Sequence, residues 1–255
     1  MSTDPLHPPK EGTPLMGAAA ALLPISNVQT LGKKLSSEFI GTFFLCFSIA
    51  LSAGHGADLA PLAIGATLMV MIFALGHVSG AHFNPAVTVA VGIRGKIAWS
   101  EAIFYIIAQL IGAFVAGGVA YGVLNDFETC FAGKIPCKEG GYPSKPDDVG
   151  AGFALVVEAI WTFALVTVVL NTATTKAQEN NSFFGLAIGL TVFAGAVSAG
   201  KISGGAFNPA VGTGLPAVHG IGKDIWIYWL GPMTGACSAA LVFNHITADP
   251  TEFYD

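Results

Sequence analysis

The chain has 255 residues, of which 53% are hydrophobic and only 11% are charged, and its formal net charge at pH 7 is −5. Soluble globular domains carry about a quarter charged residues, so this composition excludes an ordinary soluble protein and indicates a membrane protein. No basic cluster or alternation of basic and aromatic residues is present, so nothing in the sequence indicates a nucleic-acid partner.

Residues 1–34 form a polar tail that contains prolines, and we expect this tail to be flexible. Its one apolar run, 16–23, is too short to span a bilayer, and no basic segment precedes it as in a signal peptide. Six apolar runs follow, each near the ~20 residues that a spanning helix needs, at 35–54, 59–78, 102–121, 151–170, 183–200 and 225–243. A loop at 122–150 separates the third run from the fourth, and residues 244–255 form a short tail.

A nine-residue phrase occurs twice in this chain, each time after an apolar run. Residues 79–87 read SGAHFNPAV and residues 203–211 read SGGAFNPAV, so seven of the nine positions match. Proline suits the first position of a helix, because its missing N–H would have no partner there. The phrases therefore predict two helices, at about 85–93 and 209–218, which are too short to span and must enter and return from one side.

The asparagines before the two prolines, Asn84 and Asn208, are predicted to be N-caps. The side-chain oxygen of each can accept a hydrogen bond from a backbone N–H one or two residues beyond Pro85 or Pro209. This bond leaves the NH₂ group of each asparagine free to point elsewhere. Two half-helices whose N-termini meet at mid-depth would aim two positive dipole ends and two amide donors at one spot.

The two halves of the chain also repeat outside this phrase. EFIGTF at 38–43 parallels EAIWTF at 158–163, and YIIAQLIGA at 105–113 parallels YWLGPMTGA at 228–236. Each half holds three spans, an odd number, so the second half must be inverted relative to the first. We therefore predict an all-α membrane protein with six transmembrane helices and two re-entrant half-helices, in an inverted three-plus-three repeat with halves at about 35–121 and 151–243.

Positive charge near the spans is more frequent on one side of the predicted membrane domain. That side holds Lys33, Lys34, Arg94, Lys96 and Lys176, and the other holds Lys201 and Lys223. The excess favours cytoplasmic N- and C-termini, with the loop at 122–150 outside the cytoplasm.

The paired Asn-Pro-Ala boxes in an inverted repeat resemble the aquaporin (major intrinsic protein) family, over roughly residues 35–243. The resemblance implies the aquaporin fold, a homotetramer, and a pore in each protomer with Asn84 and Asn208 at its centre. It further implies a ladder of carbonyl acceptors, contributed by Gly80, Ala81, His82, Gly204, Gly205 and Ala206. The membrane would be that of a vacuole or other acidic organelle, or the plasma membrane.

The same resemblance implies a narrower filter toward the extracytoplasmic mouth, formed by Ile64, Ala196, Gly205 and Val211. Water-selective members usually have an aromatic residue, a histidine and an arginine among these positions, and all are absent here. Valine at position 211 is similar to some tonoplast intrinsic proteins, although their usual histidine is missing at Ile64. Glycerol facilitators usually have aspartate where Gly212 stands, so that subfamily fits poorly.

Two acidic residues, Glu38 and Glu158, lie inside predicted spans. Carboxylates at membrane depth can couple transport to protons or sodium ions, so a coupled secondary transporter is the alternative function. The other interpretation, which the resemblance favours, is that each carboxylate holds a re-entrant loop through hydrogen bonds to its backbone. His77 and His82 are expected to brace the first loop rather than bind metal, because no Cys, Asp or Glu accompanies them.

We therefore expect a passive channel for water and small uncharged solutes, namely urea, glycerol, ammonia and hydrogen peroxide, that excludes protons and ions. A coupled transporter and an adhesive or structural membrane protein remain as alternatives. No nucleophile and base, metal-ligand set or cofactor motif is present in the sequence, so an enzyme is not expected. Of the four cysteines, Cys46 and Cys237 lie in spans, and Cys130 and Cys137 share a loop that allows either a disulfide or two free thiols.

Overall fold

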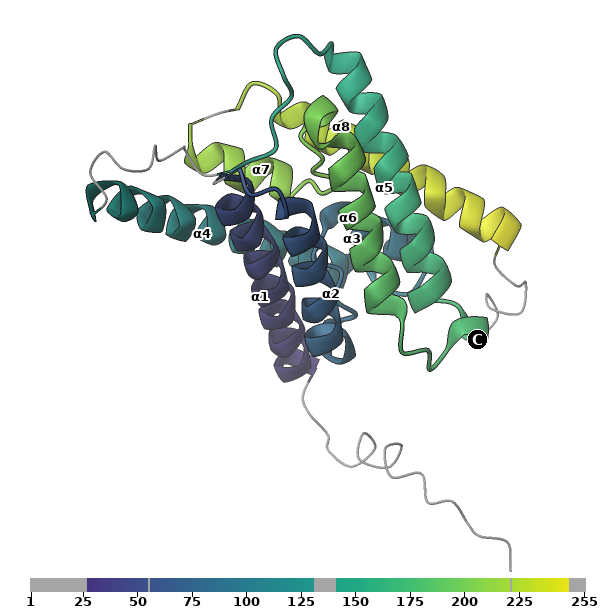
Figure 1. The fold of residues 1–255 in the computed structure, drawn as a ribbon. Coiled ribbons are helices and arrows are strands. Elements are labelled where there is room, and N and C mark those ends of the chain that lie inside the picture. Colours follow the sequence, from purple (N-terminus) through teal and green to yellow (C-terminus); the bar gives the residue numbers. More distant parts are fainter. Residues whose placement is uncertain (1–26, 55, 131–140, 221, 248–255) are drawn as a thin grey trace, which may run out of the picture.

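A computed structural model describes residues 27–54, 56–130, 141–220 and 222–247, and these are helical with connecting loops (Figure 1). Six helices are long and apolar enough to cross a membrane, as the sequence predicts. They are α1 (Asn27–Gly54), α2 (Ala60–Ser79), α4 (Trp99–Cys130), α5 (Ala151–Ala173), α6 (Phe184–Ser203) and α8 (Ile225–Val242).

Two short helices, α3 (Pro85–Ile93) and α7 (Val211–Val218), follow the two Asn-Pro-Ala boxes. The first has the predicted bounds, whereas the second begins two residues later than predicted, because Pro209 and Ala210 form a turn before the regular helix. A 3₁₀ turn, η1 (Lys176–Gln178), lies between α5 and α6, and a π-helical turn, η2 (Phe243–Thr247), extends α8.

The inverted repeat is visible in the packing of the helices. In the first half α1 packs along α4, and in the second half α5 packs along α8. The halves meet where α2 packs on α6, and there Gly65 and Gly189, equivalent residues of the two repeats, face each other. A Cβ atom on Gly65 would lie 2.6 Å from the carbonyl oxygen of Gly189, so the approach of the two backbones requires glycine. This crossing lies on the pseudo-two-fold axis of the repeat.

Burial in this protein differs from burial in a soluble protein, because some ionic and amide side chains lie inside while many large apolar side chains lie outside. Glu38, Glu158 and Gln109 are completely buried, whereas Phe44 and Phe73 are exposed. Exposed apolar side chains on spanning helices match a lipid environment, and buried polar side chains must find partners inside the protein.

Helix α1 begins at Asn27, so the expected tail 1–34 is helical in its last residues. Lysine is a good helix former and its long side chain can reach the interface from a helix end, which explains why Lys33 and Lys34 lie in the helix rather than before it. The rest of that tail, residues 248–255, Cys137 and the side chain of Cys130 lie outside the described residues, so the cysteine pairing stays open.

Candidate functional site

Each asparagine of the two boxes caps the turn that follows it. The Asn84 side-chain oxygen accepts a hydrogen bond from the Ala86 N–H at 2.8 Å, and that of Asn208 accepts from the Ala210 N–H at 2.9 Å. Asn84 has the extended backbone of an N-cap, with φ −157° and ψ 121°. The predicted side-chain bond forms at both positions, but only Asn84 is the N-cap of its helix, because α7 begins at Val211 and has Ala210 as its N-cap.

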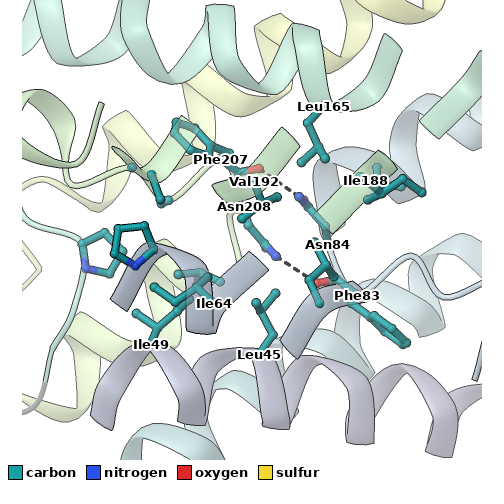
Figure 2. Close-up of a pocket in the computed structure, with 18 of the residues that line it drawn as sticks. Leu45, Ile49, Ile64, Phe83, Asn84, Leu165, Ile188, Val192, Phe207 and Asn208 are labelled. Atoms are coloured by element: carbon teal, nitrogen blue, oxygen red, sulfur yellow. Dashed lines mark hydrogen bonds between the residues drawn. The ribbon is translucent and has the colours of Figure 1, made fainter. Parts of the chain in front are cut away.

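The NH₂ groups of the two asparagines point away from their own caps and toward the opposite repeat. Asn84 donates from Nδ2 to the carbonyl oxygen of Phe207 at 2.8 Å. Asn208 donates from Nδ2 to the carbonyl oxygen of Phe83 at 2.9 Å (Figure 2). Each amide carries two N–H bonds, so one hydrogen of each asparagine holds the opposite repeat and one remains available.

The backbone before each asparagine adopts a conformation that is uncommon for residues with a Cβ atom. Phe83 and Phe207 both have φ 49°, in the left-handed region, and both are buried. Neighbouring glycines, Gly80 with φ 86° and Gly204 with φ 91°, adopt left-handed values where each spanning helix ends. The two loops therefore share one strained path, which must be held from outside.

Glu158 holds the second loop. Its carboxylate accepts hydrogen bonds from Ser203 Oγ at 2.7 Å, from the Ala206 N–H at 3.0 Å and from the Phe207 N–H at 2.7 Å. Three donors around one buried carboxylate compensate for the loss of its hydration.

Glu38 holds the first loop in the same way. Its carboxylate accepts from Ser79 Oγ at 2.6 Å, from the His82 N–H at 3.0 Å and from the Phe83 N–H at 2.7 Å. Gln109 Nε2 adds a fourth donor at 2.8 Å. The carboxylates thus contact loop backbone, as the structural interpretation of these residues requires.

The first loop has a polar network that the second loop lacks. His82 Nδ1 lies 3.2 Å from Thr88 Oγ1, which donates to the Asn84 carbonyl and accepts from Gln109 Nε2. Because the only hydroxyl hydrogen of Thr88 is already used, Thr88 Oγ1 accepts from His82 Nδ1. The equivalent positions in the second half are Ala206, Gly212 and Pro232, none of which can form this network.

A cavity of about 270 Å³ surrounds the two asparagines, with Leu45 and Leu165 on opposite sides of them (Figure 2). All four positions that the resemblance assigns to a filter line this cavity. The residues expected to supply carbonyl acceptors line it too: Gly80, Ala81, His82, Gly204, Gly205 and Ala206. Glu38 and Glu158 are completely buried and are not among the described residues that line it. His77, at the end of α2, is exposed and also lies outside this lining.

Sequence reasoning missed aliphatic lining residues on α2, α3 and α6, among them Ile72, Val87 and Ile188, and two further sets. One is aliphatic and comes from α1 and α5, with members such as Ile49 and Val169, whose spacing of 120 residues equals that between Glu38 and Glu158. That repeat offset was the signal that could have found them. The other set is Tyr142, Pro143 and Ser144, in a loop whose composition carries no such signal.

Comparisons with known proteins agree with this geometry. The profile of the family described as Major intrinsic protein matches residues 24–243. Aquaporin NIP1-1 of Zea mays is 32% identical over 238 residues, covering 90% of this chain and 79% of that protein. Aquaporin NIP3-1 of Arabidopsis thaliana is 36% identical over 235 residues, covering 89% of this chain and 70% of that protein. The X-ray structure of the aquaglyceroporin from Plasmodium falciparum matches with a TM-score of 0.75 at 24% identity, covering 88% of this chain and 100% of that chain.

An inverted repeat whose two half-helices meet in one cavity defines a membrane channel, and the chain belongs to the major intrinsic protein family. It is a passive channel for water and small solutes and not an enzyme, and coupled transport finds no support. Both plant relatives are of the NIP type. The likeness to tonoplast intrinsic proteins is therefore limited to the valine at position 211 and is not seen in these two relatives.

Proposed function

We propose that water and small uncharged solutes, including urea, glycerol, ammonia and hydrogen peroxide, pass this pore in contact with Asn84 and Asn208, and that protons and ions are excluded. The observation that carries the proposal is the reciprocal pair of asparagine bonds inside one cavity. These bonds support a fixed centre in which one amide hydrogen of each asparagine faces the solute.

The chemistry at this centre supports a preference for neutral solutes. Loop carbonyls accept hydrogen bonds from a solute on both sides of the asparagines, and the remaining amide hydrogens donate to it in the middle. Water at the centre therefore accepts from the asparagines and donates outward in both directions, which interrupts a continuous proton wire. A cation meets the positive N-terminal ends of α3 and α7, and the described lining holds no carboxylate to offset them.

The composition of the proposed outer filter supports a broad range of neutral solutes. Ile64, Ala196, Gly205 and Val211 have no charged, aromatic or hydrogen-bonding side chain. Compared with a filter that contains arginine, histidine and an aromatic ring, such a filter is wider and more apolar. Width removes the steric barrier to urea and glycerol, and apolar walls lower the cost of passing their carbon faces.

The assembly and orientation of the channel belong to the same proposal. A homotetramer with one pore per protomer, in a vacuolar or plasma membrane, follows from the resemblance. Cytoplasmic termini follow from the positive charges. The ion pair between Lys34 and Glu101, 2.8 Å long, joins the start of α1 to the start of α4 and supports placing these two ends on one side.

Replacement of Val211 with arginine tests the solute range, because arginine adds both bulk and positive charge at the proposed filter. In proteoliposomes we expect the flux of urea and glycerol to fall much more than the flux of water. Val211→Met is the matched control, since it adds length without charge and separates the two effects. Equal falls for all three solutes with Val211→Arg, or no change in any of them, would show that Val211 is not in the filter.

A further inference from the structure

The lining of the cavity consists largely of residue pairs related by the repeat. The bounds of α2 and α6 differ by 124 residues at both ends, and so do the positions of the two nine-residue phrases. Among the pairs at this offset in the lining, four contain a residue of the proposed filter: Ile64 with Ile188, Ile72 with Ala196, Ala81 with Gly205, and Val87 with Val211. The first or second member of each pair is a proposed filter residue, so the pseudo-two-fold generates a second ring from the other members.

We call the filter set the outer ring and its symmetry mates the inner ring. The outer ring is Ile64, Ala196, Gly205 and Val211, and the inner ring is Ile72, Ala81, Val87 and Ile188. Figure 2 shows Ile64 and Ile188 on opposite sides of the asparagine pair, as the symmetry requires. A solute that crosses the pore therefore passes one ring on each side of the centre.

The inner ring is the bulkier of the two. Ile72 has three more side-chain carbon atoms than its mate Ala196, and Ala81 has one more than Gly205, while the other two pairs are identical. Next to the rings the difference continues in the same direction at Phe184, whose mate is Ala60. On α1 and α5 the difference in bulk has the opposite sign, because Ile49 has one carbon atom more than its mate Val169.

The two rings also differ in exposure. The exposed fractions of the inner-ring residues are 2% for Ile72, 7% for Ala81, 4% for Val87 and 6% for Ile188, so all four are buried. In the outer ring only Val211 is buried, at 1%, whereas Ile64, Ala196 and Gly205 are half-buried. The inner-ring residues thus have less accessible surface in total than the outer-ring residues.

We infer that the inner ring of Ile72, Ala81, Val87 and Ile188, rather than the outer filter, sets the size limit for solutes in this channel. The inference rests on the proposed function, and it adds the place in the pore at which solutes are excluded by size. An arginine at position 211 would make the outer ring the narrower one. With valine there, each outer-ring residue is identical to its inner-ring mate or smaller than it. The solute class at the limit is small linear polyols, whose cross-section has to pass four aliphatic side chains.

Two symmetry-related substitutions test this inference, because Ile188→Ala and Ile64→Ala remove the same atoms from the inner and the outer ring. Permeability to water, glycerol and erythritol is measured in proteoliposomes for the parent and both variants, and water flux reports that each variant is folded. We expect Ile188→Ala to raise glycerol and erythritol flux by about tenfold, the lower end of what one methylene changes in an apolar pocket. Ile64→Ala, in the ring with the smaller side chains, should raise the same two fluxes by less than Ile188→Ala does. If Ile188→Ala fails to fold, Ile72→Val removes one carbon atom from the same ring and should raise flux in the same direction.

The result that would overturn the inference is a larger gain with Ile64→Ala, or equal gains with both variants. No gain in either variant would overturn it as well, and would locate the limit elsewhere, for example at residues 142–144. The proposed function fails separately, if the parent passes water but neither urea nor glycerol. In that case a gain with Ile188→Ala alone would still support the inner ring.

Discussion

The side chain of each of the two asparagines makes one hydrogen bond within its own repeat and one to the other repeat. Asn84 and Asn208 therefore join the halves of the protein at the same point where they face the solute. Hydrogen bonds of buried amide groups change the stability of the fold little when both partners are present. Removal of one partner leaves the other unsatisfied and costs much more free energy. The pore centre and the contact between the repeats are thus one structure, and a change at either asparagine should affect both.

Replacement of Asn208 with aspartate tests the charge argument at this scale. Aspartate cannot donate to the Phe83 carbonyl, and its negative charge offsets the positive ends of α3 and α7. We expect a lower water flux and a measurable cation conductance under voltage clamp, and Asn84→Asp should behave alike by symmetry. If both variants fold and pass water but conduct cations no better than the parent, the half-helix ends do not provide the ion barrier.

At the scale of elements, each re-entrant loop is held by a carboxylate from a neighbouring spanning helix. Glu38 on α1 and Glu158 on α5 accept hydrogen bonds from backbone N–H groups of the loop and from the serine that ends the preceding helix. The left-handed Phe83 and Phe207 lie directly beside these bonds. A loop that is strained and also bordered by a cavity needs such an anchor to keep a single shape.

Glu158→Gln removes one acceptor oxygen and the charge but retains the size of the side chain. We expect a loss of stability of about 1–3 kcal/mol, typical of a buried donor left unsatisfied, seen as a lower unfolding temperature in detergent. Glu101→Gln is the control, because its ion pair with Lys34 is partly exposed and should contribute less than about 1 kcal/mol. Equal stability of Glu158→Gln and the parent would contradict an anchoring role. A solute flux that responds to a proton gradient in the parent but not in Glu158→Gln would contradict it as well.

The elements differ in how much of them the sequence could predict. The Asn-Pro-Ala boxes determine helix starts through local chemistry, so the N-cap and the bounds of α3 could be predicted from a few residues. The hydrogen bonds from the asparagines to Phe207 and Phe83 could not be predicted. The bonded residues are 123 and 125 positions apart in sequence, and their contact depends on the depth that each loop reaches. The position of Tyr142 at the cavity was also beyond prediction, since the segment 141–150 before α5 has neither periodicity nor a repeat partner. The predicted start of this loop at residue 122 is wrong, because α4 extends to Cys130.

At the scale of the whole molecule, duplication has produced a pore with a chemically similar ring on each side of its centre. In the second half of the chain Ala206, Gly212 and Pro232 replace the network of His82, Thr88 and Gln109, yet Phe207 adopts the same φ as Phe83. The left-handed conformation therefore does not require this network. The differences between the halves, in bulk and in polarity, lie mostly along the cavity and give the two ends of the pore different properties.

Stopped-flow light scattering on proteoliposomes tests the central claim most directly, which is that this protein is a passive channel for neutral solutes. The account predicts rapid osmotic shrinkage with a low activation energy, urea and glycerol entry that depends only on their own gradients, and no ion current. Reconstituted Asn208→Asp, at equal protein density, is the comparison for ion exclusion. Slow shrinkage with a high activation energy, or solute flux that follows an imposed proton or sodium gradient, would contradict the account.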